Sequence, residues 1–342
     1  MANTHALTNA DAVQNILNTV AFPEFQKAFN NSSAFLGQVP FQAGKARIQI
    51  PMHKTGMDVT SVTSDPNDFT ETADEAGAFP EGQLIPAGSA QGRQTVEWEY
   101  KSYGTTIAIE GMVQAKASAG GYNALSDMLA EELLAGVDDL KHVISQDALG
   151  VGTDNSSGMD GVTDIISASN TVAGVSQGSN AWFASYVYDP ADDASDDDTA
   201  LTVALMDDVF QNLTDVRSAT PDAIWTSFAQ YNAYANLMSD RIRYVPYGTG
   251  DARFQGLNYN GIPVIAVPKY NATRMDFVQT SDWSLNYLPQ KSYSAEGKLV
   301  EGAFKVESRD GAGYDAISYT VVAYLSLVCR NPFKQGCLID LE

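Results

Sequence analysis

The chain has 342 residues, 44% of them hydrophobic, which is enough for one large domain or two ordinary domains with buried cores. It carries 42 acidic and 20 basic residues, and this formal net charge of -22 disfavours direct binding of nucleic-acid phosphates. No apolar run approaches the roughly 18 residues of a membrane span, and the N-terminus lacks the layout of a signal peptide. We therefore expect a soluble protein that is made in the cytoplasm and has no membrane partner.

The acidic residues are spread along the chain, with one dense patch, DPADDASDDD, at residues 189–198. This patch lacks the D-x-D-x-D-G spacing and the distal Glu of a calcium loop. Three interpretations remain open: a surface that stays solvated in high salt, a specific ion site, and an ordinary acidic surface. The charge favours the first, a halophilic surface.

The first part of the chain predicts two strands that flank a long loop. Residues 1–35 resemble an arm that becomes ordered against something else. Alternating apolar residues predict strands at 45–52 and 96–109, with a change of face near Gly104. Residues 56–94 are rich in Asp, Thr, Gly, Pro and Ala, and form either a disordered lid or an extended excursion that packs on a neighbour. The scattered apolar residues of this loop include Phe69, Phe79, Leu84 and Ile85.

A long amphipathic helix is predicted over residues 123–149. Its apolar residues recur at steps of three and four, and such a helix is about 40 Å long. The stripe is under four heptads long and ends at Gly150, which favours a packed helix over a coiled coil. The residues of the stripe are Leu125, Leu129, Leu133, Val137, Leu140, Ile144 and Ala148.

The second half of the chain mixes helices and strands. We predict a helix in TALTVALMDDVFQNLTDV, with Thr199 as its cap. We also predict a short buried strand in TPDAIWTS and a third helix in FAQYNAYANLMSDR. The Asn-Gly pair in FQGLNYNGIPVIAVPKYN indicates a hairpin, and KLVEGAFKVESRDG is again β. YDAISYTVVAYLSLVC is nearly all β-branched or aromatic, which predicts a central strand.

Titratable groups that could form a catalytic or metal site are few. The three histidines, His5, His53 and His142, include no pair with metal-ligand spacing, so we expect no metal and no cofactor. Cys329 and Cys337 could form one bridge, although two unpaired thiols are favoured.

One motif matches a catalytic pattern. Gly174-Val175-Ser176-Gln177-Gly178 fits the G-x-S-x-G nucleophile elbow of serine hydrolases. No histidine lies downstream of Ser176, and its flanks do not predict a strand followed by a helix. We therefore predict no catalytic residue and no enzyme activity, and a hydrolase using Ser176 stays the alternative from a different class.

The order of these elements resembles the major capsid protein of tailed bacteriophages and archaeal viruses, the Hong Kong 97 type. The resemblance covers nearly the whole chain. Its most suggestive pieces are SQDALGVGTDNSSGMDGVTDII, where the long helix ends in a Gly-bearing turn and a "GM.G" motif, and TPDAIWTSFAQYNAYANLMSD followed by FQGLNYNGIPVIAVP. The resemblance implies an α+β fold.

The resemblance also implies a division of the chain. Residues 1–35 would be the N-terminal arm and 56–94 the extended loop, which lies across the adjacent subunit. The peripheral domain would contain residues 36–55, 95–151 and 295–330, with 123–149 as its spine helix. The axial domain would contain residues 152–294 and 331–342.

The function implied is that of a virion protein assembled in the host cytoplasm into hexamers and pentamers of an icosahedral shell. The shell would enclose double-stranded DNA without binding it specifically, with portal and decoration or scaffolding proteins as further partners, and the charge suggests a haloarchaeal tailed virus. On the loop, Phe69, Phe79, Leu84 and Ile85 would contact the neighbour. In some relatives a lysine of this loop forms a covalent cross-link between subunits. Residues 56–94 contain no lysine, so we expect no such cross-link. An encapsulin-like nanocompartment and a tail-tube or surface-layer protein remain alternatives.

Overall fold

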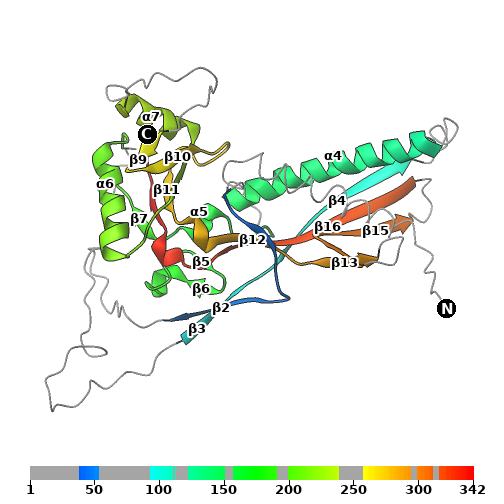
Figure 1. Cartoon of the computed structure of the whole chain (residues 1–342), viewed down its shortest axis with the longest axis horizontal. Coiled ribbons are helices and arrows are strands. Elements are labelled where there is room, and N and C mark those ends of the chain that lie inside the picture. The colour runs from blue at the N-terminus through cyan, green and yellow to red at the C-terminus, as the bar shows by residue number, and fades with distance from the viewer. Residues whose placement is uncertain are drawn as a thin grey trace, which may run out of the picture. The chain divides into compact units, whose positions relative to one another are not determined.

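The computed structural model of the protein is shown in Figure 1. The structure describes residues 38–53, 93–110, 112, 122–150, 157–190, 199–238, 257–293, 299–310 and 316–342. The chain divides into two compact units. Unit 1 takes its described residues from Met1–Ala46, Glu99–Gly161 and Ser284–Val328, and unit 2 from Arg47–Trp98, Val162–Trp283 and Cys329–Glu342.

The sheet of unit 1 is built around one long strand. Its members are β1 (Phe41–Ala43), β4 (Lys101–Glu110), β12 (Trp283–Tyr287), β15 (Phe304–Asp310) and β16 (Ala316–Cys329). β16 pairs antiparallel with both β15 and β4, so the prediction of a central strand is confirmed. β1 runs parallel to β12 in the same sheet.

The predicted long helix is confirmed as α4 (Tyr122–Leu149), which lies along β4 (Figure 1). On the predicted stripe, Leu140, Ile144 and Ala148 are buried. Off the stripe, Lys141 pairs with the exposed Asp138 at 2.9 Å. The helix ends where Gly150 takes a φ of 80°, a left-handed conformation that glycine adopts without a steric penalty.

The end of α4 is fixed to β4 by a buried hydrogen-bonded chain. The Tyr103 hydroxyl donates to Asp147 Oδ2 at 2.9 Å and accepts from the Met159 backbone N–H at 2.9 Å. A Cβ on Gly161 would lie 2.3 Å from the Gly150 nitrogen, so the backbone at residue 161 passes directly against the helix end. The "GM.G" motif therefore has a packing reason, because only glycine fits at position 161.

Among the described residues, three two-stranded ladders stand apart from the large sheets, among them β5 (Thr171–Val172) with β6 (Val175–Ser176). β2 (Ile48–His53) pairs antiparallel with β3 (Arg93–Trp98), and β13 (Gln290–Tyr293) pairs with β14 (Leu299–Gly302). The prediction that residues 56–94 are all loop was wrong at its end, because Arg93 and Gln94 pair with His53 and Met52 within β3. The rest of that loop and the predicted arm lie outside the described residues.

Unit 2 contains a mixed six-stranded sheet in the order β7-β17-β11-β8-β10-β9. Its strands are β7 (Tyr186–Tyr188), β8 (Ala223–Thr226), β9 (Asn258–Tyr259), β10 (Ile262–Ala266), β11 (Met275–Val278) and β17 (Gly336–Leu338). The predicted strand at TPDAIWTS is confirmed as β8. The predicted hairpin is confirmed as β9 and β10, which are antiparallel around Asn260 and Gly261.

Helices α6 (Val203–Gln211) and α7 (Phe228–Met238) pack on this sheet and close the core of unit 2. The prediction that Thr199 caps α6 was wrong. Thr199 is held extended, since its N–H donates to Asp340 O and the residue bridges to Leu341. The cap is Thr202, whose side chain accepts from the Leu205 N–H.

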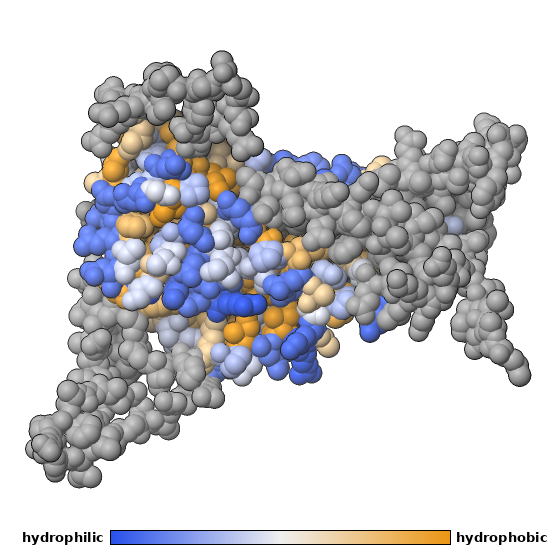
Figure 2. Space-filling view, in the orientation of Figure 1, coloured by the Kyte–Doolittle hydropathy of each residue, from blue (hydrophilic) through white to orange (hydrophobic). Residues whose placement is uncertain are grey.

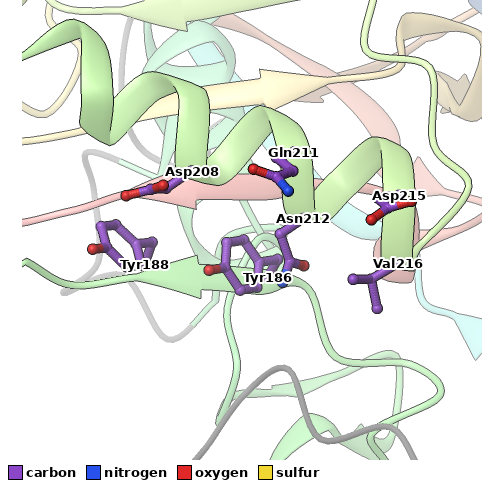
Figure 3. Close-up of a pocket in the computed structure, with 7 residues that line it drawn as sticks. All are labelled: Tyr186, Tyr188, Asp208, Gln211, Asn212, Asp215 and Val216. Carbon is purple, nitrogen blue, oxygen red and sulfur yellow. The ribbon is translucent and has the colours of Figure 1, made fainter.

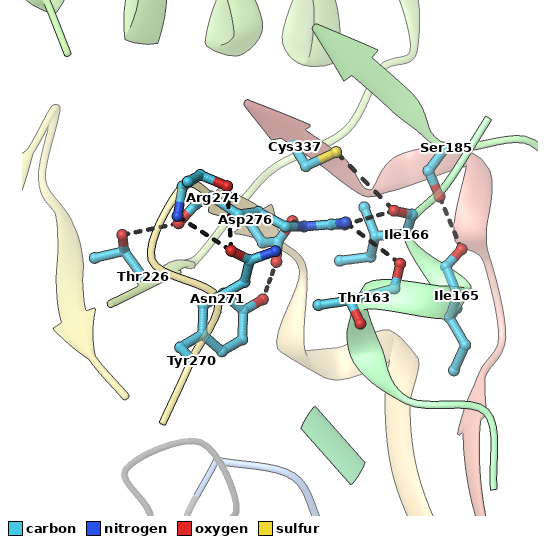
Figure 4. A network of polar contacts seen from close by, with 11 residues as sticks. Thr163, Ile165, Ile166, Ser185, Thr226, Tyr270, Asn271, Arg274, Asp276 and Cys337 are labelled. Carbon is cyan, nitrogen blue, oxygen red and sulfur yellow. Dashed lines mark hydrogen bonds and ion pairs between the residues drawn. The ribbon is translucent and has the colours of Figure 1, made fainter. Parts of the chain in front are cut away.

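A buried ion pair ties the short helix α5 (Val162–Ile165) to β11, as Figure 4 shows. Arg274 Nε donates to Asp276 Oδ1 at 2.8 Å, and the Tyr270 hydroxyl donates to the other carboxylate oxygen. The Arg274 guanidinium also donates to the carbonyl oxygens of Thr163 and Ile166. Burial raises the pKa of Asp276. Removing one member of this buried pair would leave the other without its partner, so the network is costly to disrupt.

Candidate functional site

The residues predicted to contact a neighbouring subunit lie outside the described residues. Phe69, Phe79, Leu84 and Ile85 belong to the loop between β2 and β3. Only the base of that loop is described, and it is the β2 and β3 ladder of unit 2. The contact role of these four residues therefore stays a prediction.

The Ser176 elbow does not form a nucleophile site. Ser176 ends the two-residue strand β6 (Val175–Ser176) and precedes a single 3-10 turn, η2 (Gln177–Ser179). Its backbone oxygen accepts from Asn180 Nδ2 at 2.9 Å, and in the described part of the chain no histidine or carboxylate hydrogen-bonds its hydroxyl. A short strand, β5 (Thr171–Val172), does precede the motif, which differs from the sequence prediction, but it pairs with β6 as a hairpin.

The cysteines and histidines form no chemical centre in the described residues. Cys329 and Cys337 are both free and buried, and burial raises the pKa of each thiol, to about 12 for Cys337. The prediction of two unpaired thiols is therefore confirmed. Among the described residues no group of three His, Cys, Asp or Glu side chains could hold a metal ion, and no described helix is long and apolar enough to cross a membrane.

A groove of about 460 Å³ lies in unit 2, between β7 and a neighbouring helical segment (Figure 3). Tyr186 and Tyr188 project from the strand toward the helix. The helical side is provided by α6 and by its continuation, the π-helix η3 (Asn212–Val216). The groove is lined by Tyr186, Tyr188, Asp208, Gln211, Asn212, Asp215 and Val216.

The π-helix arises from a side chain that competes for a backbone acceptor. The Thr214 hydroxyl donates to Phe210 O at 2.8 Å and to Gln211 O at 3.3 Å. A threonine hydroxyl that bonds the carbonyl four residues back loosens the regular α-helical ladder at that turn. The wider turn that follows carries Asp215 and Val216 into the lining of the groove.

The wall of the groove is held rigidly by its neighbours. A Cβ on Gly336 of β17 would lie 3.0 Å from the Leu213 side chain, so the helix sits close on the sheet at this point. Arg217 donates to the carbonyl oxygens of Ala184 and Phe333, each at 2.8 Å, and its guanidinium lies 5.5 Å from the Tyr186 ring centre. Burial lowers the pKa of Arg217 to about 10, which still leaves the group charged at neutral pH.

The lining of the groove is mainly polar. Its lining includes carboxylates, amides and tyrosines, and it contains no cysteine, serine, histidine or lysine that could act as a nucleophile or a base near neutral pH. Figure 2 shows mostly hydrophilic residues over the outer side of α6. Sequence reasoning missed this groove, because its parts come from two segments that are distant in sequence.

The family model of the SU10 major capsid protein matches residues 40–342, which is nearly all of the described chain. The chain belongs to this capsid protein family. It is therefore a shell-forming capsid protein with a structural role, as the sequence predicted. No curated protein matches the chain.

Solved structures agree in fold. The capsid of cyanophage A-1(L) matches with a TM-score of 0.61 at 13% identity, covering 100% of this chain and 97% of that one. The capsid of a native GTA particle matches with a TM-score of 0.57 at 10% identity, covering 90% and 89%. The SrpI encapsulin of Synechococcus elongatus matches with a TM-score of 0.54 at 12% identity, covering 90% and 87%. Capsid proteins thus share the α+β fold of this chain, which confirms the predicted Hong Kong 97-type architecture.

Proposed function

We propose that this capsid protein assembles into the hexamers and pentamers of an icosahedral shell that encloses the double-stranded DNA of a tailed virus. The observation that carries the proposal is the family match over residues 40–342. The experiment is to purify particles from infected or expressing cells and to measure nuclease-protected DNA in them. Protected double-stranded DNA supports the proposal, whereas particles filled with protein and free of DNA contradict it.

In the shell, the extended loop at residues 56–94 contacts the adjacent subunit. The reason is physical, since a polar loop cannot bury Phe69, Phe79, Leu84 and Ile85 by itself, while a neighbouring surface can. The contact is non-covalent, because the loop contains no lysine for a cross-link.

The loop contact is tested by replacing Phe69 and Phe79 together by Ser. The variant subunits are expected to remain folded and to lose assembly, as measured by analytical ultracentrifugation. A matched control is Met112→Ser, which changes an apolar side chain that is 66% exposed outside the loop. Normal particles from the double variant would contradict the loop contact.

The two compact units correspond in this proposal to the peripheral and axial domains. Unit 1 contains α4 as the spine helix, and unit 2 contains the mixed sheet with α6 and α7. The peripheral domain was expected over 36–55, 95–151 and 295–330. The compact units instead divide at residues 46, 98, 161, 283 and 328. Assembly takes place in the host cytoplasm, with separate portal, decoration or scaffolding proteins as partners.

The net charge of -22 gives the shell two further properties. An acidic lining repels packaged DNA, so the shell encloses it without specific binding and without enzymatic action on it. In concentrated salt the repulsion between acidic subunits is screened while apolar burial persists. The charge thus supports a haloarchaeal tailed virus as the source.

An encapsulin-like compartment is the second candidate, and the specific observation that favours it is the fold match to the SrpI encapsulin at a TM-score of 0.54. The match to the cyanophage capsid is better in both TM-score and coverage. Mass spectrometry of purified particles separates the two functions, because a compartment carries a stoichiometric cargo enzyme and a virus head carries DNA.

A further inference from the structure

Helix α7 (Phe228–Met238) stands out in this acidic chain because it carries no charge. Its sequence, FAQYNAYANLM, contains no Asp, Glu, Lys or Arg, although these residues make up 18% of the chain. Helix α6, in the same unit, carries Asp207 and Asp208, and both are exposed. A helix that faces water ordinarily has charged and polar residues on its outer side. The lack of charge therefore sets the surface of α7 apart from that of α6.

One side of α7 is fixed to the rest of unit 2. Gln230 and Tyr234, one turn apart, are 0% and 1% exposed. The Gln230 side-chain amide donates to Ala272 O at 3.1 Å and to Glu342 O at 2.8 Å. The Tyr234 hydroxyl donates to Asn258 O at 3.0 Å. These hydrogen bonds fix the rotation of the helix about its axis, so its opposite side points away from the core.

This opposite side, the outer face of α7, combines an aromatic ring with small and amide side chains. Its members are spaced at three and four residues, so they share one side of the helix. They are Phe228, Ala229, Asn232, Ala235 and Asn236. The Phe228 side chain is 55% exposed, and the other members are exposed or half-buried. The cores of protein interfaces are likewise depleted of charged residues and enriched in aromatic ones.

The net charge of -22 points to a second copy of the chain as the partner of this face. Two copies of so acidic a protein repel each other, and like charges placed opposite one another in an interface add to the repulsion. A contact between copies is therefore least opposed on a face without charge. A nucleic acid or a strongly charged protein would instead be recognised through charged side chains, which α7 lacks. Membership in a family of capsid proteins supplies the second copy.

We propose that the outer face of α7 packs against a second copy of this chain. Phe228 provides the apolar contact, and Asn232 and Asn236 provide hydrogen-bonding groups without charge. Ala229 and Ala235 allow close approach, because the side chains at a helix contact set its distance. The contact rests on the proposed assembly, and it adds to the loop contact a second interface that is made of described residues.

The first test places a thiol on the outer face. Cys329 and Cys337 are both buried, so Asn232→Cys introduces an accessible thiol into the full-length protein. Maleimide labelling is measured in dispersed subunits and in assembled protein. We expect fast labelling of the subunits and a rate lower by about tenfold or more after assembly, because a packed interface excludes the reagent. Gln211→Cys, at an exposed position on α6, is the matched control and is expected to label equally in both states.

The second test changes the face itself. Asn232→Asp adds a negative charge with little change of shape, and Phe228→Ser removes the exposed ring. Each is expected to weaken the association of subunits about tenfold or more, as measured by sedimentation at several protein concentrations. Gln211→Glu adds the same charge on α6 and is expected to leave association unchanged. Circular dichroism of the dispersed subunits verifies that each variant remains folded.

The outcomes separate this contact from the proposed function. The contact is wrong if Asn232→Asp and Phe228→Ser associate as Gln211→Glu does, or if the two thiol variants label equally in particles. Slow labelling of Asn232→Cys in dispersed subunits would also overturn it, because the chain would then cover α7 by itself. Particles free of DNA contradict the proposed function alone, since protection of Asn232→Cys in them still supports the contact.

Discussion

The Tyr103 hydroxyl on β4 donates a 2.9 Å hydrogen bond to Asp147 in α4, 44 residues further along the chain. The same oxygen accepts the Met159 N–H, so one buried phenol joins the strand, the helix end and the segment that leaves it. Burial raises the pKa of both Tyr103 and Asp147. We therefore expect the stability of unit 1 to depend on the single hydroxyl group of Tyr103.

Replacing Tyr103 by Phe removes only the hydroxyl. Asp147 then loses a donor and the Met159 N–H loses its acceptor, and leaving buried polar groups unpaired costs about 1–3 kcal/mol of the free energy of unfolding. Urea unfolding of the dispersed subunit measures the loss. The control is Ser102→Ala, an exposed position on the same strand, and a Tyr103 variant as stable as this control would contradict the role of the hydroxyl.

Gly161→Ala is expected to strain the same junction. The added Cβ would lie 2.5 Å from Gly150 Cα and 2.6 Å from Asp147 O, and backbone atoms cannot yield as a side chain does. We expect a destabilisation of about 1–3 kcal/mol or more. Gly178→Ala is the matched control because its nearest neighbour would be an ordinary 3.6 Å away. Similar melting temperatures for the two variants would show that residue 161 has room.

The buried pair of Arg274 and Asp276 is expected to behave as a unit. Asp276→Ala leaves the guanidinium buried with one partner fewer, which costs about 3–5 kcal/mol. The double variant Arg274→Met with Asp276→Leu is expected to cost less than the sum of its single changes, with a coupling of about 0.5–3 kcal/mol. Chemical unfolding of the four proteins gives the cycle, and strict additivity would mean that the pair is not coupled.

Salt dependence follows from the net charge of -22. Dialysis of particles from molar to low salt lengthens the screening distance from about 3 Å to tens of ångströms, so repulsion between subunits grows. Light scattering is expected to fall as the shell loosens. The change must reverse on return to high salt, and particles that scatter equally in both conditions would refute a halophilic shell.

Sequence periodicity predicted the elements that have one buried face or many paired neighbours. α4 was predictable because Leu140, Ile144 and Ala148 recur on one side of the helix. β16 was predictable because its residues are nearly all β-branched or aromatic, as suits a strand with neighbours on both sides. The short strand β11 was missed. All four of its residues are buried, so its sequence does not alternate between apolar and polar residues. An aspartate such as Asp276 is typical of a loop, and the sequence does not show that Arg274 binds it in the core.

The groove was not predictable for a related reason. Asp208 and Asp215 resemble a solvated helix face, and the tyrosines that complete the groove lie on β7, a three-residue strand too short to show a pattern. The helix cap shifted from Thr199 to Thr202 because a bridge to Leu341, far away in sequence, holds Thr199 extended. Contacts between segments that are separated in sequence determine both the groove and the position of the helix cap.

Electron microscopy of the purified protein in high salt tests the central claim, that the chain forms a shell. Membership in the SU10 capsid family and a fold shared with a cyanophage capsid predict closed, angular particles of uniform size. Dispersed subunits or open fibres under the same conditions would contradict it.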